Sequence, residues 1–281
     1  MVTVCSPYLW DFKQECFIEN PNGIGNSGLY IGTEMDIYME LEPTVWCTIA
    51  GVDEAKFKQH ELTKEEEERI EKAREYSKQM KLYMEDEEDF DINFLWQTLE
   101  KHKIEHNICM ACIDYIELNG ALMLEYTSTS KGMVAREDQI LLNLSKNIKA
   151  MAKKFDLTIV AYTQTNDEGR QQGLRDQSAI KGGKSLPNKA DFGITVFEPT
   201  RKELQLLEPI IDKVSKGIGK KCIPNIGYNT YKNRWYSTKK IKIWGYQDLG
   251  TNEYKDLFCT NEYYEYLDIP KTEISLLNKQ D

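Results

Sequence analysis

Two hydrophobic patterns alternate along the chain. Short, almost continuous apolar runs occupy residues 28–33, 107–116, 157–163 and 192–197. Runs of this length predict strands that are covered on both faces, as in a parallel sheet. Residues 139–155 instead carry apolar side chains at helical spacing, from Ile140 and Leu141 to Leu144, Ile148 and Met151. Strands that alternate with helices predict an α/β fold with a mainly parallel, twisted sheet flanked by helices.

The polar residues between these runs predict where other elements begin and end. A helix is expected over residues 36–50, stopped by Gly51, and another over residues 94–102. Thr63 and Glu66 have the spacing of a capping box. The helix that they open is interpreted as solvated, with a narrow apolar stripe at Ile70, Ala73, Tyr76 and Met80. Residues 119–138 and 166–187 are predicted to be loops, and the remainder to alternate short strands, including 239–244, with turns. A single domain over residues 1–281 is the most economical interpretation.

The net charge of −10 is unevenly distributed. Residues 61–91 hold 13 acidic and 6 basic side chains, whereas residues 213–242 hold nine Lys and Arg and no acid. The whole-chain charge is therefore a poor guide to partners, and it does not exclude a nucleic acid.

Several function classes are disfavoured by composition. No apolar run reaches the roughly 20 residues that span a bilayer, and the first residues do not resemble a secretory signal, so a cytoplasmic protein without a membrane partner is expected. The seven cysteines are interpreted as reduced thiols. Cys109 and Cys112 would point to opposite faces of a strand. His102 and His106 are interpreted as an exposed helix end, and a metal hydrolase therefore fits poorly.

Polar residues stand at the ends of three successive predicted strands. Glu34 follows LYIGT, Asp114 follows NICMACI and Gln164 follows LTIVAYT. Ligands of parallel sheets gather at the carboxyl ends of their strands. An acid there can hold Mg²⁺ through water, a second acid can polarise an attacking water, and an amide can sense a γ-phosphate. Taken singly, each residue could simply cap a loop.

The chain resembles the RecA-like motor domain of DnaB-type replicative helicases, particularly phage-borne versions. The matching segments are LYIGTEMD, MACIDYIEL, REDQILLNLSKNIKAMAKKFDLTIVAYTQTN, IKGGKSLPNKADFGITVF and YKNRWYSTKKIKIW. They occur in the order of the family and span roughly residues 28–258. The resemblance implies a RecA-like P-loop NTPase core with a β-rich C-terminal part.

The resemblance also implies roles for individual residues. Glu34 matches the glutamate that orients the attacking water, and Asp114 matches the Walker B aspartate that supports Mg²⁺. Gln164 matches the glutamine that couples phosphate state to the DNA loop. Lys232 and Arg234 match a basic pair that reaches a neighbouring subunit's nucleotide, where the arginine offsets charge on the transferring phosphoryl group.

The segment IKGGKS matches the family's central DNA-binding loop. Lys181, Gly183 and Lys184, together with Arg175 in the same loop, are therefore candidates for contact with the DNA backbone. Glycine lets the main chain approach a phosphate closely, and lysine adds positive charge. Without the resemblance, Lys181 and Lys184 are equally well explained as ordinary surface lysines.

One departure from the family concerns the phosphate-binding loop. The pattern GxxxxGK followed by Ser or Thr, whose amides and lysine cradle phosphates, does not occur in the chain. Residues 5–18 take roughly the place of the helix that follows that loop, and residues 213–221 are interpreted as a basic turn. The retained candidate residues favour a fragment or split product over a degenerate site, while a chain that fills a ring and borrows catalysis from active neighbours stays open.

The resemblance implies ATP and Mg²⁺ as cofactors, and single-stranded DNA as a partner inside a homo-oligomeric, hexameric ring. A primase or helicase loader is a further expected partner, although the family's N-terminal primase-binding domain is missing. Two alternatives remain: a RecA-like recombinase or strand-binding ATPase, and a non-catalytic interaction protein on a decayed motor fold with the acidic residues 61–91 as its docking face.

Overall fold

The fold was analysed in a computed structural model that describes residues 1–21, 23, 27–129, 136–166, 173–181, 186–219, 221–234 and 241–268. The chain divides into two compact units. The first contains Met1–Ala190 and Asp248–Glu253, and the second contains Asp191–Gln247 and Tyr254–Asp281. Each unit is described by itself. The expectation of one motor domain over residues 1–281 stays a prediction.

The first unit is built on a four-stranded sheet in which all neighbouring strands run parallel. Its order is β4-β3-β5-β6, and the strands are β3 (Gly28–Gly32), β4 (Leu82–Asp86), β5 (Met110–Asp114) and β6 (Thr158–Ala161). The central strands β3 and β5 are buried at most positions. The predicted parallel α/β sheet is therefore confirmed, and three of its strands coincide with the apolar runs.

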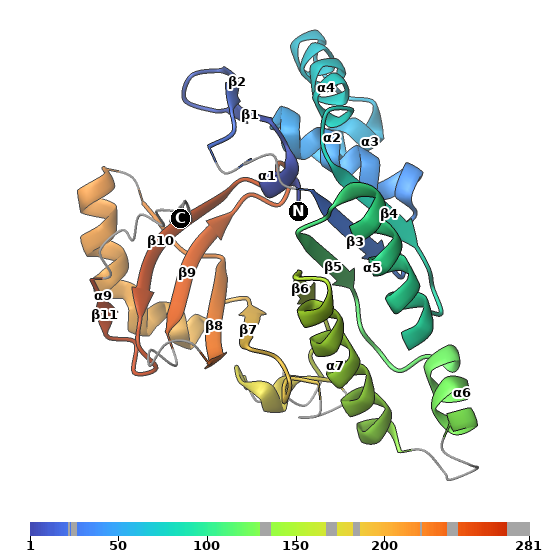
Figure 1. Cartoon of the computed structure of the whole chain (residues 1–281). Coiled ribbons are helices and arrows are strands. Elements are labelled where there is room, and N and C mark those ends of the chain that lie inside the picture. The colour runs from blue at the N-terminus through green and yellow to red at the C-terminus, as the bar shows by residue number, and fades with distance from the viewer. Residues whose placement is uncertain are drawn as a thin grey trace, which may run out of the picture. The chain divides into compact units, whose positions relative to one another are not determined.

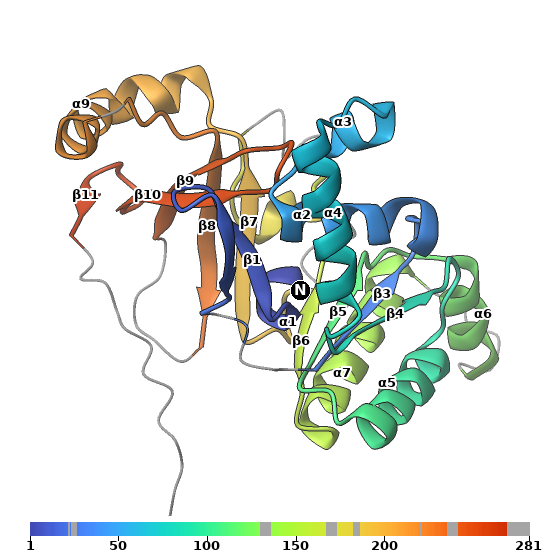
Figure 2. The same cartoon turned by 90° about the horizontal axis from the view of Figure 1, so that it is seen from above.

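Helices cover both faces of this sheet (Figures 1 and 2). On one face lie α5 (Ile92–His106) and α7 (Glu137–Lys154), and on the other lie α2 (Glu42–Ala50) and α4 (Lys64–Ser77). A π-helical turn, η1 (Ile37–Leu41), leads into α2, and α3 (Glu54–Gln59) follows it. Gly51 ends α2 in the left-handed conformation, at φ 59°, as its sequence position predicts.

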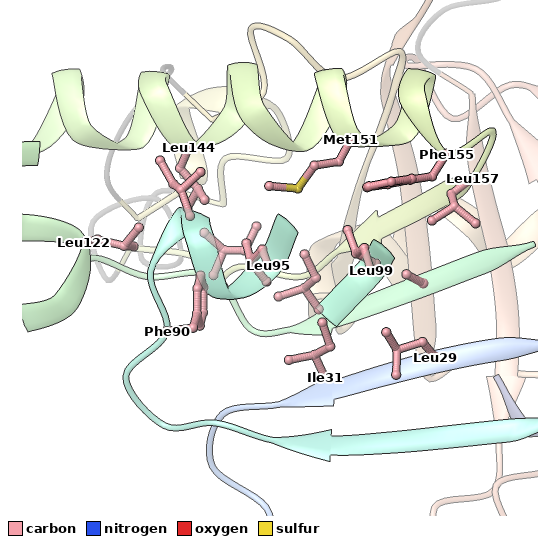
Figure 3. Close-up of a cluster of buried hydrophobic side chains, with 14 of the residues drawn as sticks. Leu29, Ile31, Phe90, Leu95, Leu99, Leu122, Leu144, Met151, Phe155 and Leu157 are labelled. Carbon is pink, nitrogen blue, oxygen red and sulfur yellow. The ribbon is translucent and has the colours of Figure 1, made fainter. Parts of the chain in front are cut away.

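The largest core cluster lies between the sheet and the pair α5 and α7. Figure 3 shows Leu144 and Met151 of α7, and Phe155 directly after it, directed toward Leu95 and Leu99 of α5. Below them lie Leu29 and Ile31 of β3, which are fully buried. Apolar burial of this kind contributes roughly 1.5–3 kcal/mol per large side chain. The carboxyl ends of the strands are thus held by a well-packed core.

The N-terminal residues differ from their predicted structure. After α1 (Val2–Cys5), the strands β1 (Tyr8–Asp11) and β2 (Cys16–Glu19) form an antiparallel hairpin. The expectation that residues 5–18 correspond to a helix is therefore wrong. Aromatic side chains explain the difference, because Trp10 and Phe17 pack edge to face across the hairpin, and Phe17 also packs against Tyr76 of α4.

Helix α4 is less solvated than expected. Its capping box is present, with Thr63 accepting from the Glu66 amide and Glu66 accepting from the Thr63 amide. Ile70 and Ala73 of the apolar stripe are buried in a second core cluster, which also includes residues of α2. The acidic side chains face solvent while this narrow stripe docks the helix, so the interpretation as a solvated helix is corrected.

Residues 119–138, predicted to be a loop, contain helix α6 (Gly120–Thr129). The helix is capped from a distant segment, because Asp89 Oδ1 accepts from the Ala121 amide at 3.1 Å. Leu122 anchors it in the main core. Asn119 also caps the helix locally, because its Oδ1 accepts from the Leu122 amide at 2.8 Å. An asparagine before an apolar segment is a helix-start signal, which the loop prediction did not use.

The two helical histidines also differ from expectation. His102 is 4% exposed, and its Nε2 lies 2.7 Å from Glu85 Oε1 at the end of β4. The ring of His106 stacks on Tyr83 with centroids 3.8 Å apart. The interpretation of these residues as an exposed helix end is therefore wrong for His102, which packs against a strand that the sequence analysis did not predict.

The second unit combines an antiparallel sheet with one long helix. The sheet order is β11-β10-β9-β8-β7, formed by β7 (Phe192–Phe197), β8 (Ile226–Asn233), β9 (Lys242–Gln247), β10 (Tyr254–Thr260) and β11 (Tyr266–Leu267). Helix α9 (Arg201–Ile218) packs Leu207 and Ile211 against Phe197, Trp244 and Phe258. Residues 201–218 were expected to be strands and turns, and residues 213–221 a basic turn; α9 corrects both predictions.

Candidate functional site

The strand register brings the two predicted catalytic acids to the same edge of the parallel sheet. Gly32 at the end of β3 lies opposite Asp114 at the end of β5, and Glu34 follows two residues later. Gln164 comes three residues after the end of β6, which pairs with the other side of β5. Adjacent parallel strands deliver their carboxyl ends to one edge, so the three residues are grouped there as predicted.

Hydrogen bonds fix the turns that leave β3 and β5. The amide of Thr33 donates to the carbonyl oxygen of Asp114 at 3.0 Å, and the Thr33 hydroxyl donates to the same oxygen at 3.2 Å. The amide of Tyr115 donates to Thr33 Oγ1 at 3.1 Å, and the Asp114–Tyr115 peptide is cis. Thr33 therefore joins the segment that carries Glu34 to the segment that carries Asp114.

Each acid accepts a hydrogen bond from a tyrosine. The Tyr30 hydroxyl donates to Asp114 Oδ2 at 2.8 Å, and the Tyr115 hydroxyl donates to Glu34 Oε1 at 2.7 Å. The bond to Glu34 raises the pKa of Tyr115 to about 12. Burial, followed by the bond to Asp114, raises the pKa of Tyr30. Both hydroxyls therefore stay protonated at neutral pH and act as donors.

Sequence reasoning missed both tyrosines. Tyr30 stands inside the apolar run that predicts β3, and Tyr115 follows Asp114 directly. The available signal was their position, because a phenol within or just after a buried strand needs a partner for its hydroxyl.

The donors at this edge suit Mg²⁺ better than a tightly chelated metal. Asp114 is half-buried and Glu34 is exposed. Mg²⁺ prefers oxygen ligands and usually keeps several waters, using one or two carboxylates together with substrate phosphates. Among the described residues, no group of three or more His, Cys, Asp or Glu is arranged to hold a metal by itself. The elements described before β3 are α1 and the hairpin of β1 and β2.

The candidate DNA loop is hydrogen-bonded to the segment after β6 that carries Gln164. The Lys181 amide donates to the Gln164 carbonyl at 2.9 Å, and Thr165 forms an antiparallel bridge with Ile180. A short 3-10 turn, η2 (Gln177–Ala179), precedes this bridge, and the Asn166 side chain donates to the Ser178 carbonyl at 3.1 Å. Residues 178–181 of the loop are thus joined to residues 164–166, at the predicted phosphate sensor.

The basic candidates of this loop differ in what the structure shows. Lys181 Nζ lies 3.1 Å from Glu117 Oε2, in an ion pair whose two side chains are 52% and 42% exposed. Arg175 is half-buried. Gly183 and Lys184 lie outside the described residues. The contacts of Lys181 with DNA stay a prediction.

Lys232 and Arg234 belong to the second unit. Lys232 lies near the end of β8, where it is opposite Gly193 of β7. The Arg234 amide donates to the Asp191 carbonyl at 3.0 Å, and its guanidinium lies 3.4 Å from Asp191 Oδ1. Both side chains sit beside the start of β7. Their predicted action on a neighbouring subunit's nucleotide is not tested by these contacts.

None of the helices that the structure describes has the length and apolar content needed to cross a membrane.

Solved structures of other proteins share this fold. A solved structure described as an "ATPase Domain" aligns with a TM-score of 0.64 at 15% sequence identity, covering 83% of this chain and 75% of that one. A second, described as "The Structure Of A DnaB-Like Replicative Helicase And Its Interactions With Primase", aligns with a TM-score of 0.62 at 15% identity, covering 82% of this chain and 50% of that one. At this identity, both alignments show a shared fold.

The sequence comparisons are more specific. The chain is 28% identical over 270 residues to the "SPbeta prophage-derived uncharacterized protein YorI" of Bacillus subtilis (strain 168), covering 95% of this chain. It spans about half, 52%, of the length of that relative. The family model of the DnaB-like helicase C terminal domain matches residues 26–222, which include Glu34, Asp114 and Gln164. The RecA-like α/β fold is therefore confirmed, and the chain belongs to the DnaB-like helicase C-terminal domain family.

Proposed function

We propose that this chain acts as the motor domain of a replicative DNA helicase, which uses ATP to translocate on single-stranded DNA and to unwind the duplex ahead. The observation that supports this most is the grouping of Glu34, Asp114 and Gln164 at one sheet edge, with the candidate DNA loop tied to Gln164 by backbone hydrogen bonds. A hexameric ring with DNA in its centre is part of the proposal.

The proposed role of each residue is compatible with its contacts. Mg²⁺, when bound with ATP, would neutralise phosphate charge, and Asp114 would hold one of its waters. Glu34 is exposed at the sheet edge and would orient the attacking water. Gln164 would move in response to the γ-phosphate. The hydrogen bond from the Lys181 amide to the Gln164 carbonyl would transmit this movement to Lys181. Arg234 would act on the nucleotide of a neighbouring subunit.

Binding of labelled ATP in the presence of Mg²⁺ tests the nucleotide site. The proposal predicts saturable binding that Asp114→Asn weakens, because that substitution removes the charge that holds the hydrated cation. Glu105→Gln on α5 is a matched control, since it removes an exposed acid away from the sheet edge. Absence of binding at millimolar ATP would contradict a catalytic role.

Phosphate release tests the motor. Addition of single-stranded DNA is expected to stimulate release, and Glu34→Gln is expected to reduce the stimulated rate by about 10²-fold or more, as loss of a residue that orients the attacking water does. If the Glu34→Gln variant keeps its affinity for labelled ATP, the slower release reflects loss of hydrolysis and not loss of nucleotide binding. Electron microscopy on DNA distinguishes a closed ring from the filament expected of a recombinase.

A second candidate is a non-catalytic interaction protein built on the motor fold. The observation that favours it is that the sequence of 281 residues does not contain the GxxxxGK pattern, which cradles phosphates. This candidate predicts no DNA-stimulated phosphate release and identical behaviour of the Glu34→Gln variant. We propose a primase or a helicase loader as the protein partner under either function.

A further inference from the structure

A small pocket lies next to the candidate DNA loop, at the carboxyl ends of β5 and β6. Its volume is about 230 Å³. It is lined by Tyr115, Ile116, Glu117, Leu118, Glu137, Leu141, Thr163, Gln164, Lys181 and Leu186. Pockets for drug-sized ligands are usually larger, about 300–1,000 Å³, so this one suits a single small ring system.

The inner wall of the pocket is apolar and well supported. Ile116 and Leu141 are 3% and 1% exposed and belong to the packed interior. Leu186 is anchored to α7, because the Ser145 hydroxyl donates to its carbonyl oxygen at 2.7 Å. An apolar wall of this kind favours a flat, weakly hydrated group over an ion.

The rim carries charge of both signs. Glu117 and Glu137 supply two carboxylates, and Lys181 supplies one ammonium group. The excess of negative charge disfavours a phosphate inside the pocket, whereas carboxylate oxygens accept hydrogen bonds from amino groups. Phosphate is better placed outside, beside Lys181, since the pair of Lys181 with Glu117 at 3.1 Å is exposed and therefore weak enough to exchange.

We infer that this pocket binds one unstacked nucleobase of the single strand, while Lys181 contacts a phosphate of the same strand. Exchange of Lys181 from Glu117 to that phosphate frees a carboxylate to accept from the base, and Tyr115, Leu118 and Leu141 supply the surface on which the ring packs. Cytosine and adenine, which carry an amino group at the position where thymine carries an oxygen, bind better than thymine. This inference rests on the proposed binding of single-stranded DNA.

The first experiment compares two labelled strands of equal length, oligo(dC) and an abasic strand, by fluorescence anisotropy with the full chain. Both strands present the same number of phosphates, so the electrostatic contribution to binding cancels. The abasic strand is expected to bind about tenfold more weakly, because one packed base contributes roughly 1–3 kcal/mol. Equal affinities would overturn the pocket.

Substitutions then locate the effect. Leu141→Phe places a ring in the pocket. It is expected to lower the affinity for oligo(dC) to that for the abasic strand, while the affinity for the abasic strand stays unchanged. Glu137→Gln keeps the shape and is expected to reduce the preference for oligo(dC) over oligo(dT) several-fold. Glu100→Gln is the matched control, because Glu100 is exposed, forms an ion pair with Lys154 at 3.3 Å and does not line the pocket.

The possible outcomes separate the inference from the function on which it rests. Salt-dependent binding of both strands with no difference between them, or a difference that Leu141→Phe leaves intact, overturns the pocket alone. Absence of salt-dependent binding to either strand overturns the proposed DNA binding and the pocket together. Circular dichroism identifies any variant that does not fold. If Leu141→Phe does not fold, the effect of Glu137→Gln on the preference for oligo(dC) over oligo(dT) tests the pocket, and an unchanged preference overturns it.

Discussion

The two sheets use similar apolar segments in different ways. In the first unit, Leu29 and Ile31 of β3 are fully buried, and helices cover both faces of the sheet. In the second unit, β7 alternates strictly, with Thr195 and Phe197 buried toward α9 and Ile194 43% exposed. An apolar run therefore predicts a strand, but the number of covered faces depends on which helices the fold supplies.

The same contrast separates the candidate site residues. Glu34 and Asp114 follow buried central strands and are joined through Thr33. Lys232 and Arg234 lie at the end of β8, next to Asp191, in a sheet that a helix covers on one face. The residues predicted to act in catalysis thus lie at or just after the ends of strands of the packed core, and the residues predicted to act on another subunit lie at the end of a strand of the sheet that α9 covers on one face.

The largest expected effect comes from removing a core side chain in the parallel sheet. Leu29→Ala should lower the free energy of unfolding by about 2–5 kcal/mol, because it leaves a cavity beneath α5 and α7. Val196→Ala, on the exposed face of β7, should change it by less than about 0.5 kcal/mol. Urea unfolding measures both, and equal losses would remove the distinction between the sheets.

A second test compares the two tyrosine–carboxylate pairs. Tyr30→Phe removes the donor to half-buried Asp114 and should cost about 1–3 kcal/mol of folding free energy. Tyr115→Phe removes the donor to exposed Glu34 and should cost less than about 1 kcal/mol. Thermal unfolding of both variants checks the order, and a larger cost for Tyr115 would contradict it.

The two capping boxes offer a third comparison. Thr63→Ala in α4 should cost about 1 kcal/mol. Thr200→Ala in α9 should cost up to about 2 kcal/mol, because its partner Glu203 is 7% exposed and also accepts from the Tyr264 hydroxyl. Denaturant midpoints of the two single variants test this, and a smaller effect at Thr200 would show that burial does not strengthen the box.

The smallest expected effect is a pH dependence. The folded pKa of Tyr115, about 12, lies above its reference value of 10.0, so the folded state holds this proton more tightly. Its contribution to stability is complete below pH 10 and is lost as the pH rises from about 10 to about 12. Ultraviolet difference titration against Tyr115→Phe measures this ionisation. Glu34→Gln should lower the pKa, and an unchanged value would exclude the bond to Glu34 as its main cause.

Much of the first unit could be predicted because its signals are local. The apolar runs mark β3, β5 and β6, and Thr63 with Glu66 marks the start of α4. The grouping of Glu34, Asp114 and Gln164 followed from the rule for parallel strands.

The missed elements depend on contacts between distant residues or on a misread pattern. Strand β4 ends in charged residues within the acidic segment, and within the described residues it pairs with β3 alone. Helix α9 did carry a signal, since Thr200 and Glu203 have capping spacing and Leu204, Leu207 and Ile211 recur at helical intervals, but Pro209 interrupts the pattern. The tyrosine donors were missed because sequence spacing does not show which hydroxyl meets which acid.

The paired ends of the loop after β6 have a consequence for variation in length. Thr165 and Ile180 form a bridge, and the Lys181 amide donates to the Gln164 carbonyl. The two ends of the segment between Thr165 and Ile180 are therefore held next to each other. Insertions or deletions between Thr165 and Ile180 are therefore expected to leave the bond between Gln164 and Lys181 as it is. The length of that segment can evolve independently of the coupling between the sheet and Lys181.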